Sequence, residues 1–207
     1  MREDDVDRAA QRAQRYWFDD GLAEIAIGAI LVSIGLLFYA EAVLPPEILP
    51  PGFSSLGLLV VLFGGWWLAG RFVRAAKSRL TYPRTGYVAY ARPRRRRLGA
   101  AAGVGAVIAA LTVVLFAMAP TSLAWLPTLQ GLIGAAFAAY VGYRFGLTRF
   151  YALAVVSVLI GTSASLAGLG NELGDAVYYL AIGLAFIISG LLTLYAYLRA
   201  NQRPTEG

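Results

Sequence analysis

The sequence predicts an all-α membrane protein: a polytopic helix bundle of six transmembrane helices, arranged as three hairpins, with both termini in the cytoplasm. Of its 207 residues, 58% are hydrophobic and only 14% are charged, whereas an ordinary soluble domain has roughly a quarter charged residues. Apolar stretches of about 20 residues, the length that crosses a bilayer as a helix, recur along the chain. The basic residues fall only in alternate connectors, as the positive-inside rule requires.

The predicted spans fill most of the chain and leave no room for a separate soluble domain. Residues 1–20 form a cytoplasmic N-terminal segment, residues 21–198 the six-helix membrane domain, and residues 199–207 a cytoplasmic tail. Residues 74–97 form a basic cytoplasmic loop inside the membrane domain. The six spans cover about residues 21–44, 53–73, 98–119, 126–143, 150–169 and 176–198.

The 18 basic residues assign the orientation. They lie before span 1, between spans 2 and 3, between spans 4 and 5, and after span 6, and the other three connectors contain none. Such a bias places the N- and C-termini on the cytoplasmic side. A composition rich in Arg, Ala and Gly, with one Lys, favours a bacterial origin, so we expect a multi-pass protein of the bacterial cytoplasmic (inner) membrane.

The composition also excludes several chemistries. The chain has neither Cys nor His, which excludes disulfide scaffolds, Cys/His metal sites, His-ligated haem and His-dependent triads. We expect no metal and no cofactor, and no motif identifies a catalytic residue. Nucleic-acid binding would need a basic surface on a soluble module, so nucleic acid is not an expected partner.

Two acidic residues at the start of span 1 form the main candidate site. Asp20 is a plausible N-cap, because its carboxylate can accept from the first free amides of the helix. Glu24 lies one turn further in. Together with Gly28 and Gly35 they fall within an arc of about 80° on the helix, so the acidic pair is expected to face protein.

The role of this acidic pair has two interpretations. An ionisable group inside a membrane helix is a functional candidate, so Asp20 and Glu24 are a candidate cation or proton site, with Glu24 as the titrating member. The alternative is structural: because Glu24 is shallow, it can form an ion pair with a basic residue at the inner face. The candidate partners are Arg84, Arg144 and Arg149.

Small residues mark three helix-packing seams, where another backbone can approach closely. Gly28 and Gly35 in span 1 share a seven-residue spacing with Gly183 and Gly190 in span 6, and Gly99 and Gly103 open span 3. The repeated spacing in oppositely directed spans is typical of inverted repeats in transporters, and also of chance recurrence in apolar helices. The seam of span 3 is suited to packing against small residues of span 4, or against a second protomer.

The basic loop after span 2 is a candidate contact site for anionic lipid or for a cytoplasmic partner. Each Lys or Arg beside an anionic leaflet contributes about 1 kcal/mol of attraction. Membrane lipids with anionic headgroups at the cytoplasmic face are therefore the expected partners, together with a homo-oligomer or another membrane protein. The candidate contact residues are Tyr82, Arg84, Tyr87, Arg94, Arg95, Arg96 and Arg97.

Three segments resemble a pattern in uncharacterised bacterial six-helix integral membrane proteins. The first is the entry to span 1, Asp19-Asp20-Gly21-Leu22-Ala23-Glu24, and the second is the loop segment Leu80-Thr81-Tyr82-Pro83-Arg84-Thr85-Gly86-Tyr87-Val88. The third is the end of span 6, from Gly183 to Gly190-Leu191-Leu192 and then Tyr197-Leu198-Arg199. The resemblance covers most of the chain and implies no established activity, so it transfers no site residue.

The leading functional hypothesis is a non-enzymatic membrane protein with a structural, regulatory or assembly role. The alternative is a small transporter or channel with Glu24 at the inner end of its path. An intramembrane enzyme is the least favoured class, because the predicted spans contain few polar side chains.

Overall fold

The structure, a computed structural model of the chain, describes residues 18–45, 47–49, 53–81, 125–169 and 171–201. These residues form five α-helices and one short π-helical segment, and contain no strand. The predicted span 98–119 lies outside them. In chain order the elements are α2 (Leu22–Val43), α3 (Phe53–Ala76), η1 (Lys77–Thr81), α6 (Leu126–Phe145), α7 (Thr148–Leu166) and α8 (Asn171–Ala200).

Four helices are long and apolar enough to cross a membrane, which fits a multi-pass membrane protein. They are α2, the helix formed by α3 with the start of η1, α7 and α8. The 20-residue α6 is not among them, because Pro127, Thr128 and Gln130 lower the hydropathy of its first turns. The described residues thus supply five of the six helices that the sequence predicts.

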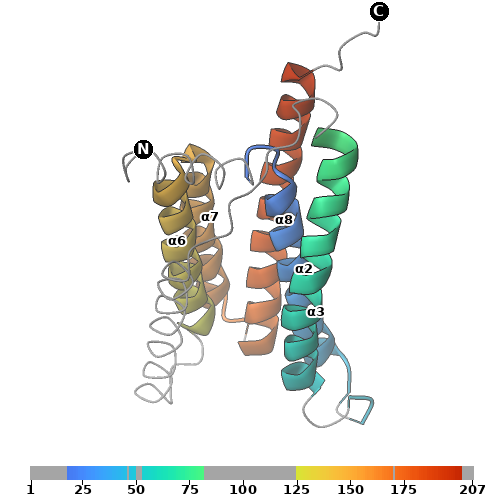
Figure 1. Cartoon of the computed structure of the whole chain (residues 1–207). Coiled ribbons are helices and arrows are strands. Elements are labelled where there is room, and N and C mark those ends of the chain that lie inside the picture. Colours follow the sequence, from blue (N-terminus) through green and yellow to red (C-terminus); the bar gives the residue numbers. More distant parts are fainter. Residues whose placement is uncertain (1–17, 46, 50–52, 82–124, 170, 202–207) are drawn as a thin grey trace, which may run out of the picture.

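The helices pack as two groups that lie side by side (Figure 1). One group contains α2, α3 and α8, and the other contains α6 and α7. The most extensive contacts join α2 to α8 and α6 to α7, while α3 contacts α2 and the α7–α8 contact is smaller. The closest partner of α8 is thus α2, at the other end of the sequence, and not its hairpin neighbour α7.

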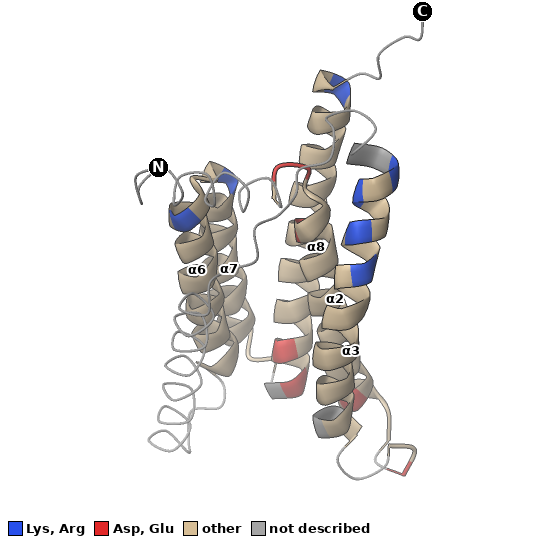
Figure 2. Ribbon diagram, in the orientation of Figure 1, with Lys and Arg blue, Asp and Glu red and all other residues tan. Residues whose placement is uncertain are grey.

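The basic residues that the structure describes gather at one end of the bundle, which we call the basic end (Figure 2). At this end α2 and α7 begin and α3, α6 and α8 end. Acidic residues occur at both ends (Figure 2). Asp20 and Glu24 at the basic end each form an ion pair with a basic residue of another helical element, so charge pairing between helices occurs at this end.

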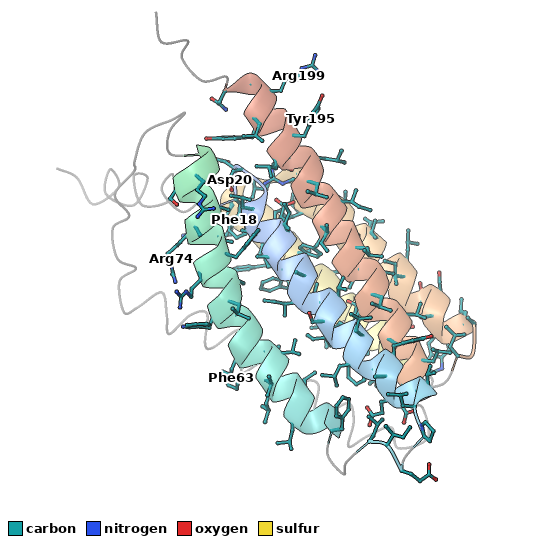
Figure 3. The ribbon with its side chains drawn as sticks, turned by 90° about the vertical axis from the view of Figure 1, so that its right-hand side faces the viewer. Phe18, Asp20, Phe63, Arg74, Tyr195 and Arg199 are labelled. Carbon is teal, nitrogen blue, oxygen red and sulfur yellow. The ribbon has the colours of Figure 1, made fainter. Side chains whose placement is uncertain are left out.

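Large apolar side chains cover the outside of α3. Phe63 is 75% exposed and Trp66 is 73% exposed, and Phe63 lies on the side of α3 away from α2 (Figure 3). In water such a surface would favour aggregation, whereas lipid chains solvate it. Arg71 lies over the ring of Trp67, 4.8 Å from its centroid, an arrangement suited to the headgroup level of a membrane.

Candidate functional site

A tight turn leads into α2 at the basic end. The Gly21 amide donates to the Phe18 carbonyl oxygen at 3.2 Å, and Gly21 has a φ of 72°, which only glycine adopts at little cost. The prediction that Asp20 is the N-cap is wrong: the N-cap is Gly21. The Asp20 carboxylate still accepts from the Leu22 amide at 3.3 Å, but its other oxygen is directed toward another helix.

That oxygen forms a buried ion pair with Lys77. Asp20 Oδ2 lies 2.8 Å from Lys77 Nζ, and the two side chains are 1% and 0% exposed. Lys77 begins η1, directly after α3, so the pair joins the start of α2 to the end of α3. Sequence reasoning missed Lys77, because the predicted span ended at Val73. The available signal was that Lys77 is the single lysine among 17 arginines.

Glu24 is fully buried and is held by residues of two other helices. Arg149 Nε, on α7, lies 2.6 Å from Glu24 Oε1, and Ser189 Oγ, on α8, donates to Glu24 Oε2 at 2.7 Å. Arg149 also donates through Nη2 to the Phe18 carbonyl oxygen at 2.5 Å. Of the three candidate arginines, the structure pairs Arg149 with Glu24, while Arg84 lies outside the described residues.

Together these contacts form a charged cluster at the basic end, made of Asp20, Lys77, Glu24, Arg149 and Ser189. Phe18 closes one side, since its ring contacts those of Phe145 and Phe150 at centroid distances of 5.1 and 5.7 Å. Phe18 and Asp20 lie at the same end as Arg74 (Figure 3). The cluster places two anions against two cations and so joins α2, α3, α7 and α8.

A glycine seam continues from the cluster along α2. A Cβ atom built on Gly28 would lie 2.6 Å from the Gly183 carbonyl oxygen, and one on Gly190 would lie 2.7 Å from the Gly21 carbonyl oxygen. Gly35 packs in the same way against Ala176 and Leu180. The seven-residue spacing in both helices therefore matches an antiparallel contact between α2 and α8.

The small face of α6 packs against α7. A Cβ atom on Gly131 would lie 2.7 Å from the Ser157 carbonyl oxygen and 3.2 Å from the Gly161 Cα. We expected this face to pack against span 3 or a second protomer. The structure instead places α7 against Gly131. Gly99 and Gly103 lie outside the described residues, so their packing stays a prediction.

The candidate contact residues of the basic loop also lie outside the described residues. They are Tyr82, Arg84, Tyr87, Arg94, Arg95, Arg96 and Arg97. Their proposed contacts with lipid or a partner stay predictions.

Chemically, the charged cluster can hold helices together more readily than it can bind a substrate. Both of its carboxylates lie within 3 Å of a basic nitrogen. No protein-family model, curated protein or solved structure matches this chain. Geometry alone therefore carries the functional argument.

A cavity of about 440 Å³ lies between the two helix groups, and no residue of the charged cluster lines it. Leu31 of α2, Ile133 of α6, Ser157 of α7 and Phe186 of α8 line it, and neither Asp20 nor Glu24 does. A transport path starting at Glu24 would require that carboxylate in its wall.

Proposed function

We propose that this chain is a non-enzymatic protein of the bacterial cytoplasmic membrane, with a structural or assembly role and both termini in the cytoplasm. The observation that carries the proposal is the use of its acidic groups. Asp20 and Glu24 are the ionisable residues in the best position for proton or cation chemistry, and both are in ion pairs between helices.

The cost of burying these charges supports a structural role. Taking an ion out of water costs several kcal/mol, and a close counter-ion with further hydrogen bonds offsets much of that cost. Such a cluster tolerates little change in helix position, because each charge needs its partner at short range. The cluster therefore favours a basic end whose helices keep fixed positions over one whose helices move apart.

The same cluster makes a transporter the second candidate. A small transporter or channel would use Glu24 as a proton or cation site, and Arg149 would then have to move away from it. The two functions differ in what neutralising Glu24 does, so one substitution separates them.

We predict that Glu24→Gln lowers the free energy of unfolding by about 2 kcal/mol, a value below the usual range for buried pairs because Arg149 is partly exposed. The double variant with Arg149→Gln should lose less than the sum of the single losses, since the two residues share one interaction. Denaturant unfolding in lipid-containing micelles measures both quantities, and Glu47→Gln in the exposed connector is the matched control.

Measurements of proton and cation flux distinguish the structural role from the transporter. Reconstituted wild-type protein should show proton and cation flux no greater than that of protein-free liposomes. Wild-type flux above this level, abolished by Glu24→Gln without loss of stability, would establish the transporter and contradict the proposal.

The proposed orientation has a direct test, because the chain has no Cys. A membrane-impermeant maleimide should label Glu47→Cys in intact cells, since this connector joins the ends of α2 and α3 away from the basic end. It should label Arg199→Cys only after the membrane is permeabilised. The opposite labelling pattern would show that the topology is the inverse of the one proposed.

Anionic headgroups are the proposed contact of the basic end. Three exposed arginines lie there, Arg71, Arg74 and Arg79. Arg74 and Arg79 belong to the start of the predicted basic loop 74–97, which is helical as far as Thr81. Each contributes about 1 kcal/mol of attraction to an anionic leaflet, which supports a cytoplasmic location for this end.

A further inference from the structure

A buried carboxyl group lies at the end of the bundle opposite the basic end, where α8 begins. Asp175 belongs to the second turn of α8 and is 5% exposed. The basic residues that the structure describes lie at the other end (Figure 2), and Asp175 forms no ion pair with any described residue. This carboxyl group therefore lacks the counter-ion that Asp20 and Glu24 both have.

The side chain of Gln130, on α6, is the hydrogen-bond partner of Asp175. One oxygen of each side chain, Gln130 Oε1 and Asp175 Oδ1, is buried and has no hydrogen-bond partner among the residues that the structure describes. The existing bond therefore joins the amide nitrogen of Gln130, its only donor group, to the other carboxylate oxygen, Asp175 Oδ2. Buried polar atoms rarely lack a partner, and here two acceptors lack one within a single pair of residues.

One proton on Asp175 would give both oxygens a partner. A carboxylate only accepts hydrogen bonds, whereas a carboxylic acid has one O–H donor. A carboxylic acid and a primary amide can therefore form two hydrogen bonds with each other, one from N–H and one from O–H. In the ionised form the second bond cannot form, and leaving two buried acceptors unsatisfied is unfavourable.

The surrounding charges also disfavour an ionised Asp175. Glu172, one turn earlier on α8, is a second acidic group beside it, and the titratable groups in the last two turns of α2 are Tyr39 and Glu41. The first two turns of α6 and the last two turns of α7 contain none. A negative charge on Asp175 would thus be repelled and not compensated by the described residues at this end.

The two tyrosines that follow Asp175 on α8 do not supply the missing donor. Tyr178 Oη donates to the Gln130 carbonyl oxygen at 3.0 Å, and a hydroxyl has only one hydrogen. The ring of Tyr179 stacks on Phe38 of α2, with centroids 5.8 Å apart. Neither hydroxyl bonds to Asp175 Oδ1.

We propose that Asp175 and Gln130 form a proton-binding site that joins the two helix groups. Protonated Asp175 donates through Oδ1 to Gln130 Oε1, while Gln130 Nε2 donates to Asp175 Oδ2. The same contact between α6 and α8 includes Pro127 against Gly174 and the bond from Tyr178 to the Gln130 carbonyl oxygen. As the pH rises, the Oδ1–H bond breaks and the proton passes to water. One interhelical hydrogen bond is then lost, so the contact weakens.

Infrared spectroscopy of the full chain in phosphatidylcholine liposomes tests the site, because the C=O stretching band of a protonated carboxylic acid is separate from carboxylate bands. At about pH 5.5, where an ordinary Asp is ionised, the wild type should show this band and Asp175→Asn should lose it. The matched control is Glu47→Gln in the exposed connector, which should keep the band. The site lies outside the charged cluster, so this result does not depend on the role proposed for Glu24.

Gln130→Leu tests the partner of the carboxylic acid. It removes the amide that bonds to Asp175, so the acid band should move to higher wavenumber, as it does when a carboxylic acid loses a hydrogen bond. The matched control is Thr128→Val on the same helix. Thr128 bonds to Ser165 and to the Gly161 carbonyl oxygen of α7, so this change should leave the band in place.

The bound proton also predicts a pH dependence of stability. Between about pH 4.5 and pH 5.5 the folded chain would keep a proton that an unfolded Asp175 has released, so stability falls as the pH rises. Over this interval the unfolding equilibrium constant of the wild type should rise roughly 5- to 10-fold relative to that of Asp175→Asn, close to the effect of one proton per pH unit. Denaturant unfolding in lipid-containing micelles measures this ratio.

Several results would overturn the proposal. A wild-type spectrum without the acid band at about pH 5.5, or the same band in Asp175→Asn, would show that Asp175 holds no proton. A water molecule or a cation between the two oxygens would give this result. An unshifted band in Gln130→Leu would exclude Gln130 as the partner, and equal pH dependence of the wild type and Asp175→Asn would exclude a proton taken up on folding. The wild-type spectrum stands even if a variant fails to fold.

Discussion

Replacing Asp20 with Asn is expected to lower the free energy of unfolding by about 3 to 5 kcal/mol, the usual result of removing one partner from a buried ion pair. Asn keeps the size of the side chain and an oxygen that can accept from the Leu22 amide, so the change isolates the charge. Lys77, which is 0% exposed, then loses the carboxylate that compensates its ammonium. Denaturant unfolding in lipid-containing micelles measures the loss.

Two further variants test the cause. Asp20→Asn combined with Lys77→Met should be more stable than Asp20→Asn alone, because no buried cation remains. Arg74→Met removes a positive charge from the exposed surface of α3, one turn before Lys77, and should change stability by less than about 0.5 kcal/mol. If Arg74→Met and Lys77→Met cost the same, the burial of the pair would not be the source of its stability.

Gly28→Leu is expected to separate α2 from α8 and to lower the free energy of unfolding by about 3 kcal/mol or more, at or above the upper end of the effect of overpacking. A Cβ at this position already lies 2.6 Å from the Gly183 carbonyl oxygen and 2.9 Å from the Ile187 amide nitrogen. Both are backbone atoms, which cannot rotate away as a side chain can. The helices must therefore move apart and lose the contacts on either side.

Gly64→Leu is the matched control, since nothing lies within 4 Å of a Cβ built on Gly64 of α3. It should leave the unfolding free energy unchanged or raise it, because leucine forms helix better than glycine. Equal losses for the two substitutions would attribute the effect to glycine itself and not to close packing at the α2–α8 contact.

The positions of the helices along the sequence could be predicted from hydropathy, whereas the helix against which each one packs could not. The first predicted span, residues 21–44, corresponds closely to α2, because a run of apolar residues sets both its length and its ends. The last span was predicted to begin at residue 176, yet α8 begins at Asn171. Gly174 lies inside the helix, where it packs against the side chain of Pro127, a contact that local sequence cannot reveal.

The charged cluster could likewise be predicted only in part: its acidic residues could be identified from the sequence, but their partners could not. The positions of Asp20 and Glu24 at a helix start made them candidates, and the number of nearby basic residues made an ion pair plausible. Which cation each would meet depends on how α3 and α7 lie against α2, and this is a property of packing. Ser189 carried no signal of its own, because a serine in a membrane helix normally bonds to its own backbone.

The length of α8 has a mechanical consequence. Its 30 residues span about 45 Å, whereas the hydrocarbon core is about 30 Å thick. Gly190 lies opposite Gly21 at the start of α2, and Thr193 and Leu194 still pack at this end of the bundle. Residues 195–200 continue beyond them as an overhang of about 9 Å, which carries Tyr195 and Arg199 (Figure 3). Sliding of α8 along α2 would bring larger side chains against the glycines, so the close contacts fix the register of the two helices. The position of the overhang relative to the start of α2 is therefore set by the contact between Gly21 and Gly190.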